Sequence, residues 1–327
     1  PWHPPNRFSE MSLAAVRFAS LARQSSGRRF SSNKLAQDPI KFLVIDGYAP
    51  AGREDLRNHG ASEAGHLYKK MLERVSPLRS ETDIIYPADP DFVNPSPAEL
   101  QKYHGVAWTG SSLTVHHHED ERVQSQLRLA RSICEKRIPS FGSCWAVQIA
   151  AVALGGVVAK CPLMGREQGI CRKIQLTDIG RSHPMMEGKP SVFDAFGAHD
   201  DEVTHLPPTG LNLATNSHSM VQATSAMVGF AEFWAVQYHP EYDLHELARL
   251  TSARIEKFIR LGFFKTPEDA KEYISHLDTI HADPTRKDLM WRYGLDKDVL
   301  SEDVRLVEVR NWVKKLVVPY RREGLGL

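Results

Sequence analysis

The segment PSFGSCWAVQIAAVALGG, residues 139–156, constrains what this chain can fold into more than any other stretch. The short run IPSFG (Ile138–Gly142) is typical of a buried strand, and Ala146–Leu154 has the small, apolar composition of a buried helix. Cys144 stands in the turn between them, where the carboxyl end of a strand meets the N-terminus of a helix. Backbone N–H groups at a helix N-terminus favour a thiolate, so this corner indicates a nucleophilic cysteine in an open α/β fold.

Short apolar runs alternate with amphipathic segments over the first half of the chain. The predicted strands are Ile40–Asp46, Asp83–Ala88, Gly105–Gly110 and Ile138–Gly142, and the predicted helices are Ala61–Val75, Asp120–Lys136 and Ala146–Leu154. This alternation predicts the α/β class, with an open, mostly parallel sheet and helices on both of its faces.

From Gly156 onward, short strand-like runs are separated by Gly, Pro, Asp and Asn residues. The runs are GVVAK, GICRKIQLTD, SVFDAF, LNLATNS, SMVQATS and FWAVQYHP. They predict a small antiparallel section that returns one strand to the main sheet. A helix over Asp243–Leu261 is predicted to follow.

The composition divides the chain into three regions, 1–38, 39–264 and 265–327. The first is targeting-like, because residues 11–36 hold five Arg or Lys, six Ser and no Asp or Glu, as organelle transit peptides do. We expect this region to be disordered and to direct import into mitochondria or another organelle; a basic tail without a targeting role is the alternative. The second is the α/β domain. The third is a charged helical extension that starts at Thr266, a capping residue followed by proline.

The composition of the whole chain argues against several classes of protein. Forty-one basic and 40 acidic residues give a net charge of +1, which does not favour binding to nucleic acid or acidic membranes. The longest apolar run, Ala146–Ala159, is interrupted and is shorter than the roughly 18–20 residues of a membrane span. Four cysteines without a C-x-x-C pair favour reduced thiols over disulfides or a zinc site. We therefore expect no nucleic-acid partner, no membrane association, no metal and no cofactor.

A nucleophilic thiol needs a neighbouring base, because its ordinary pKa of about 8.5 leaves it mostly protonated at neutral pH. The segment FWAVQYHPE (Phe233–Glu241) supplies one, since an apolar strand ends at His239 and Pro240 stops the ladder there. Glu241 lies two residues further on, so its carboxylate can face the same side and orient the imidazole. The pattern predicts a triad of Cys144, His239 and Glu241.

These two blocks, PSFGSCWAVQIAAVALGG and FWAVQYHPE, closely resemble the signature blocks of class I (triad-type) glutamine amidotransferases. AWTGSSLT (107–114) lies where that family carries its oxyanion loop. GAHDDEVTHLP (197–207) resembles its Ser/Asn-His-x-Asp-x-Val stretch, and GREQGI (165–170) resembles the segment before the antiparallel part. The matches keep a consistent order over about Phe42–Leu261, and they are most similar to the amidotransferase domain of GMP synthase and its stand-alone relatives. The resemblance implies a flavodoxin-like fold and, for the core family, a cytoplasmic location.

The resemblance also implies a reaction. Cys144 would attack the side-chain carboxamide of glutamine, His239 would move the proton to the departing ammonia, and Glu241 would hold His239. Water would then hydrolyse the γ-glutamyl thioester. The residues implied for the oxyanion site are Gly110, Ser111 and Trp145, through backbone N–H groups. The residues implied for substrate binding are Gln148, Ala198, His199 and Asp201.

The sequence departs from the family pattern in three places. Ala146 stands where the family often has glycine, and the oxyanion loop reads Gly110-Ser111-Ser112 where Gly-Gly-Pro is usual. The chain also has no Ser-Gly-Gly-x-Asp-Ser pyrophosphate loop, so we expect any ammonia-accepting synthetase to be a separate partner.

Three functions stay open at this point. The first is ammonia release from glutamine for a separate or unknown acceptor. The second is hydrolysis of glutathione-like γ-glutamyl compounds, as in the γ-glutamyl peptidases of the same fold. The third belongs to another class, a catalytically silent binding protein, which would commonly have lost one member of the triad. The oligomeric state is equally open, and a homo-oligomer is one alternative.

Weaker signals have simpler explanations. VHHHED (115–120) is interpreted as a solvated loop, with contact at a pocket rim and metal binding as alternatives. Cys134 is expected in the core, and Cys161 and Cys171 are expected to be structural thiols. The basic and aromatic stretch Arg286–Leu295 is interpreted as a packed helical tail, although it can also dock a partner or a second copy of the chain.

Overall fold

The computed structural model describes residues 38–117, 119–161, 165–228 and 231–323. The targeting-like region, residues 1–38, lies outside the described residues except for Asp38.

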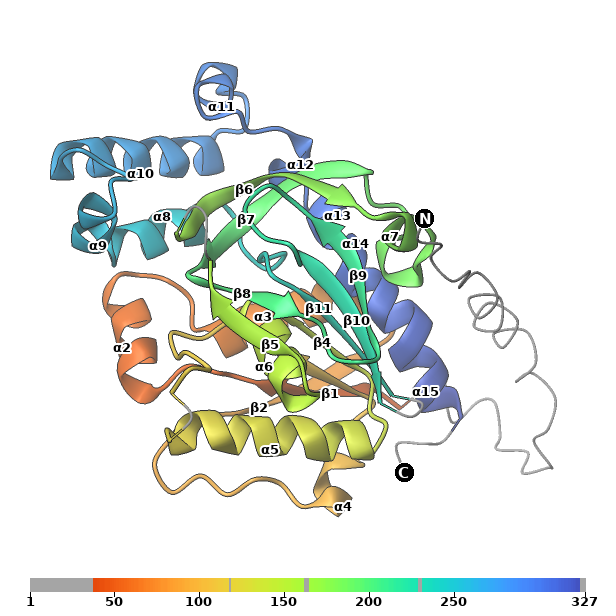
Figure 1. Cartoon of the computed structure of the whole chain (residues 1–327). Helices are drawn as coiled ribbons and strands as arrows, with labels where there is room; N and C mark the ends of the chain where they lie inside the picture. The colour runs from red at the N-terminus through yellow and green to blue at the C-terminus, as the bar shows by residue number, and fades with distance from the viewer. Residues whose placement is uncertain (1–37, 118, 162–164, 229–230, 324–327) are drawn as a thin grey trace, which may run out of the picture. The chain divides into compact units, whose positions relative to one another are not determined.

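A nine-stranded sheet forms the centre of the unit that spans residues 39–327, in the order β2-β1-β3-β4-β11-β10-β9-β6-β7 (Figure 1). The five parallel strands are β2 (Ser80–Ile85), β1 (Ile40–Ile45), β3 (Gly105–Trp108), β4 (Ser140–Ser143) and β11 (Ala231–Val236). The antiparallel strands are β10 (Ala223–Val228), β9 (Gly210–Thr215), β6 (Glu167–Leu176) and β7 (Val192–His199). A separate two-stranded sheet pairs β5 (Val157–Lys160) with β8 (Asp201–His205).

Helices cover both faces of the sheet, as predicted from the alternating pattern. Along β1, Phe42 and Val44 face a core shared with α3 (Ala64–Val75), while Leu43 and Ile45 face a core shared with α5 (Glu121–Glu135) and α6 (Trp145–Ala153). Successive side chains of a strand point to opposite faces, so both faces of this apolar strand are buried. The remaining helices are α2 (Pro50–Asn58), α4 (Pro97–Leu100), α7 (Asp178–Ser182), η2 (Pro184–Met186), α8 (Leu244–Ser252), α9 (Ile255–Arg260), α10 (Pro267–Ala282), α11 (Lys287–Tyr293), α12 (Lys297–Leu300), α13 (Glu302–Arg305), α14 (Val307–Trp312), η3 (Val313–Val317) and α15 (Val318–Arg322).

The antiparallel section is larger than predicted. As predicted, this section returns one strand, β11, to the parallel part of the sheet. Strands β10, β9, β6 and β7 also join the same sheet. Their pairing covers the edge of β11, which would otherwise have a row of unpaired backbone groups. The helix predicted over Asp243–Leu261 is two helices, since the chain breaks between α8 and α9 at Arg254, where φ is −133°. Neither Gly nor Pro marks that break.

The C-terminal helices pack into the core of the same unit. The indole ring of Trp312 is fully buried and lies 5.8 Å from the ring of Phe42 and 5.9 Å from that of Phe141, between ring centroids. The predicted helix start is confirmed, because Thr266 caps α10 in a capping box with Asp269. The division at residue 264 stays a prediction. Among the described residues, no helix is long and apolar enough to cross a membrane.

Candidate active site

The turn between β4 and α6 holds Cys144 in a strained backbone conformation, with φ of 52° and ψ of −97°. The N–H of Cys144 donates a hydrogen bond to the carbonyl of Val236 in β11, at 2.8 Å. A Cβ at Gly142 would lie 2.4 Å from the Cβ of Ala146 and 2.6 Å from the carbonyl oxygen of Trp108, so that position accepts no side chain. Positive φ at a non-glycine residue costs backbone energy, and such strain is found more often at active sites than elsewhere.

The register of the sheet explains why residues so far apart in sequence meet. Strands β4 and β11 are parallel neighbours, and Val236 at the end of β11 pairs with Ser143 at the end of β4. The segments that follow these two strands therefore leave the sheet at the same edge. Cys144 and His239 therefore line one cavity, close enough for Cys144 to act on the pKa of the imidazole, while the thiol donates a long hydrogen bond of 3.9 Å to the carbonyl of Ala198. Glu241 Oε1 lies 2.6 Å from His239 Nδ1.

The charge of His239 follows from its neighbours. Burial lowers the pKa of this imidazole, but the negative charge of Glu241 and the interaction with Cys144 raise it to about 10 overall. An imidazolium at neutral pH is the partner that stabilises a thiolate. The ring of His239 is held flat against the ring of Tyr242, with 4.1 Å between centroids and 3° between planes.

A chain of hydroxyl groups supports Glu241 from behind. Ser143 Oγ donates to Glu241 Oε1 at 2.9 Å, and the Tyr68 hydroxyl donates to Ser143 Oγ at 2.6 Å. Burial raises the pKa of Tyr68 well above its ordinary value, so its hydroxyl stays a donor. No sequence signal marks this chain of contacts, because Tyr68 resembles any residue on the buried face of α3.

The residues implied for the oxyanion site lie beside the triad. Ser111 and Trp145 line the cavity. Gly110 lies against the imidazole of His239, because a Cβ at position 110 would lie 3.0 Å from Cε1 of that ring. The Ser111 hydroxyl donates to the carbonyl of Gly47 at 2.7 Å, which fixes the loop that follows β3.

The four residues implied for substrate binding, Gln148, Ala198, His199 and Asp201, line the same cavity, whose volume is about 560 Å³. Asp201 is buried and holds the loop after β3, since Oδ2 accepts from the Thr114 hydroxyl at 3.0 Å and Oδ1 lies 3.2 Å from Nε2 of His116. His116 of the three-histidine loop thus contacts a residue that lines the cavity but does not line it itself, and the interpretation of this loop stays a prediction.

Comparisons with known proteins show the family to which the chain belongs. The family model for glutamine amidotransferase class-I matches residues 66–255. The chain belongs to the class I glutamine amidotransferase family. It is 29% identical over 297 residues to a gamma-glutamyl-L-1-hydroxyisopropylamide hydrolase from a Pseudomonas species, covering 88% of this chain and 97% of that protein. It is 28% identical over 178 residues to a glutamine-hydrolyzing GMP synthase subunit of Saccharolobus solfataricus, covering 54% of this chain and 85% of that protein.

The fold of this amidotransferase family member matches that of solved structures. A glutamine amidotransferase from Thermotoga maritima superposes with a TM-score of 0.54 at 17% identity, covering 86% of this chain and 99% of the other. The predicted α/β class and the family resemblance are both confirmed.

One group of buried side chains has metal-ligating atoms close together, Glu167, Cys171 and His199. Its carboxylate is already occupied, because Glu167 hydrogen-bonds His199 Nε2 at 2.8 Å, Gln222 Nε2 at 2.8 Å and Asn216 Nδ2 at 2.7 Å. These hydrogen bonds make the group a polar network that supports β6 and β7. They also occupy carboxylate oxygens and an imidazole nitrogen that an ion would need as ligands.

Cys161 has a neighbour that the sequence did not reveal. Its Sγ lies 3.7 Å from Nδ1 of His199, and the residue lines the cavity. Burial nevertheless raises the pKa of the Cys161 thiol to about 12, so it stays protonated. The other lining residues that sequence reasoning missed include Tyr48, Tyr242 and Arg254. Only Tyr242 carried a local signal, since it follows the His-Pro-Glu block directly.

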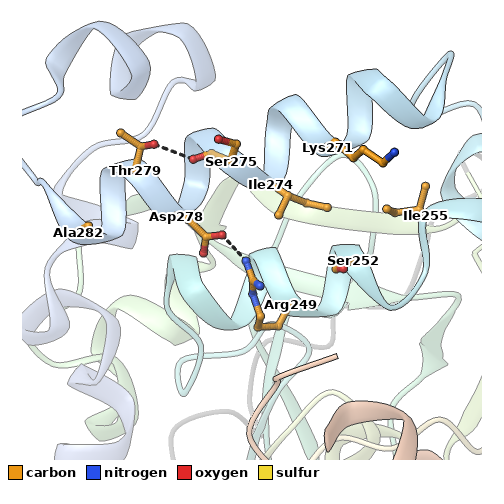
Figure 2. A pocket seen from close by; sticks show the side chains of 9 residues that line it. All are labelled: Arg249, Ser252, Ile255, Lys271, Ile274, Ser275, Asp278, Thr279 and Ala282. Carbon is orange, nitrogen blue, oxygen red and sulfur yellow. Dashed lines mark hydrogen bonds and ion pairs between the residues drawn. The ribbon is translucent and has the colours of Figure 1, made fainter. Parts of the chain in front are cut away.

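Figure 2 shows a second hollow, between α8 and α10, with a volume of about 630 Å³. Arg249 of α8 forms an ion pair with Asp278 of α10 across it. None of the predicted site residues lines this hollow, and its lining has neither a thiol nor an imidazole. It is therefore separate from the candidate active site.

Proposed function

We propose that this protein hydrolyses γ-glutamyl amides with Cys144 as nucleophile. The observation that carries the proposal is that Cys144 and His239 line one cavity of about 560 Å³ and that Glu241 holds the His239 ring from behind, at 2.6 Å. Clefts of about 300–1,000 Å³ hold small-molecule ligands. A silent binding protein would have no need to keep all three groups in contact.

The reaction follows from these positions. The Cys144 sulfur attacks the amide carbonyl and forms a C–S bond, and backbone N–H groups of Ser111 and Trp145 stabilise the oxyanion. His239 then passes its proton to the leaving nitrogen, the C–N bond breaks, and ammonia or an amine departs. Water, deprotonated by His239, attacks the thioester and releases glutamate and the thiolate.

The leaving group is proposed to be an amine larger than ammonia. The similarity to a hydrolase of a γ-glutamyl alkylamide, which extends over 88% of this chain, supports this choice. The similarity to the GMP synthase subunit favours a second candidate, in which glutamine is the substrate and a separate synthetase accepts the ammonia.

One assay tests the proposal and separates the candidates. The purified protein is incubated with L-glutamine, γ-glutamyl-methylamide and γ-glutamylglycine, and glutamate release is measured beside the Cys144→Ala variant. Turnover of the larger compounds that disappears in the variant supports the proposal. Turnover of glutamine alone supports the second candidate. Absence of turnover with every compound, or turnover that survives the substitution, refutes the Cys144 mechanism.

A further inference from the structure

Three side chains line the cavity next to His239: Tyr242, Tyr48 and Arg254. The Tyr242 ring stacks on the imidazole, and the Arg254 guanidinium donates a hydrogen bond to the phenol of Tyr48. His239 is the group proposed to protonate the leaving nitrogen. A leaving group that takes its proton from His239 lies close to this ring, and therefore within reach of the side chains that line the cavity beside it.

Arg254 differs from the other cations of this cavity wall. Arg166 and Lys257 both pair with Asp200, at 2.6 Å and 3.1 Å, and Lys160, which also lines the cavity, is exposed to solvent. Among the described residues, no carboxylate lies within 4.0 Å of the Arg254 guanidinium; its neighbour is the phenol of Tyr48, and Asp55 acts on its charge only from farther away. A half-buried cation without a carboxylate in direct contact is poorly solvated, so a ligand carboxylate gains more there than at the surface.

The guanidinium of Arg254 is suited to binding a carboxylate. Burial lowers the pKa of Arg254, but the neighbouring hydroxyl groups of Tyr48 and Tyr242 raise it overall, so the charge is kept. A guanidinium presents its N–H donors in a planar fork that binds a carboxylate through two parallel hydrogen bonds. Tyr48 fixes one part of the fork, which leaves the remaining donors for a ligand.

We propose that Arg254 binds a carboxylate carried by the leaving group of the substrate. The preferred substrates are then γ-glutamyl amino acids and peptides, in which the released amine is itself an amino acid, and glutamine is a poor substrate. This inference rests on the proposed function, and it adds the residue that selects the leaving group.

The test compares two substrates that differ only in the charge of the leaving group, γ-glutamylglycine and γ-glutamyl-glycinamide. The wild-type enzyme is expected to prefer γ-glutamylglycine by about 10- to 100-fold in kcat/KM, mostly through KM, because a charged hydrogen bond is lost with the amide. In Arg254→Met the preference should vanish through loss of γ-glutamylglycine turnover alone, and Arg254→Lys should retain part of it. Arg260→Met, on the exposed side of α9, is the matched control and should behave as wild type.

Each other outcome overturns the inference. Equal turnover of the two substrates by the wild type would mean that no leaving-group carboxylate is recognised. An equal fall for both substrates in Arg254→Met would assign the residue a structural role. A second pair, γ-glutamyl-glycinamide and 4-aminobutyryl-glycinamide, differs only in the α-carboxylate of the acyl part; if Arg254→Met removes discrimination within that pair instead, the residue binds the acyl part.

A binding measurement separates this inference from the proposed function. Calorimetry with the Cys144→Ala variant needs no turnover. Tighter binding of γ-glutamylglycine than of its glycinamide, abolished by adding Arg254→Met, supports the carboxylate site even if the wild type hydrolyses neither compound. Equal affinity, or no binding of either, refutes it.

Discussion

At the scale of single residues, the site depends on a cysteine whose backbone is strained and on an imidazole whose charge is set by its neighbours. Cys144 has a positive φ, and Gly142, two residues earlier, has no side chain that would meet Ala146. Ala146, which stands where the family often has glycine, therefore fits into the turn. The imidazole of His239 is buried and close to two anionic groups or potential anions, Glu241 and Cys144.

Replacement of Glu241 tests the electrostatic part of this arrangement. The pKa of His239 is raised to about 10, so activity that needs the imidazolium persists below that pH and falls as the pH rises through it. Glu241→Gln removes the largest raising influence, so the alkaline limit of kcat/KM should move to lower pH and kcat should fall about 100-fold or more. The pH profile of hydrolysis measures both effects.

The exposed Glu256→Gln on α9 is the control for the loss of one negative charge. An alkaline limit that stays in place in Glu241→Gln would contradict the assigned role of the carboxylate.

Gly142→Ala tests the space in the turn. Its Cβ would lie 2.6 Å from the Trp108 carbonyl and 2.4 Å from the Ala146 Cβ, so the variant should lose about 1–3 kcal/mol of unfolding free energy, as overpacked cores do. Urea unfolding measures this loss. Adding Ala146→Gly should recover part of it but not all, since the contact with the carbonyl remains; full recovery would show that the backbone contact is unimportant.

At the scale of elements, the site is assembled by three neighbouring strands and one helix. β4 and β11 bring Cys144 and His239 to one edge, the loop after β3 adds Ser111, and α3 reaches Glu241 through Tyr68 and Ser143. The helix is therefore part of the support of the triad and not only of the core.

Tyr68→Phe tests this support from α3. The variant removes the donor to Ser143 and leaves the ring in place, so stability should fall by only about 1 kcal/mol. We expect kcat to fall several-fold and KM to change little, because Ser143 is then free to turn away from Glu241. Steady-state kinetics with γ-glutamyl-methylamide measures the effects on kcat and on KM separately. Tyr103→Phe loses a comparable hydrogen bond, to Asp83, at an exposed place and should leave kcat unchanged.

The parts of the site that the sequence predicted are those with local signals. Cys144 follows a strand and precedes a helix, and His239 ends a strand at a proline, so each is recognisable from its immediate neighbours. Tyr68 and Arg254 act through residues far away in sequence, and the register that brings them close is a property of the whole sheet. Arg254 also stands in a run that reads as one continuous helix, where a charged residue is expected at the surface.

At the scale of the whole 39–327 unit, the C-terminal helices and the edge of the sheet that leads to His239 share a buried polar cluster. Lys189 Nζ lies 2.9 Å from Glu308 Oε1 of α14, and both side chains are almost fully buried. The Tyr238 hydroxyl also donates to Glu308, and Tyr238 directly precedes His239 in the chain. The sequence did not predict this cluster, because the C-terminal region has many charged residues and the sequence alone does not distinguish buried charges from exposed ones.

Glu308→Ala leaves Lys189 buried without a partner, which should lower the free energy of unfolding by about 3–5 kcal/mol. Replacing both partners, in Lys189→Met with Glu308→Leu, removes the unpaired charge and should restore most of that loss. Arg310→Ala breaks an exposed pair between Arg310 of α14 and Asp303 of α13 and should cost about 1 kcal/mol or less, as surface ion pairs do. Urea unfolding measures all three variants, and hydrolysis below the unfolding transition shows whether loss of the Tyr238 contact reaches His239. If Glu308→Ala is no less stable than Arg310→Ala, the C-terminal helices are not anchored to the sheet through this pair, and their apolar contacts with the core, including those of Trp312, must hold them.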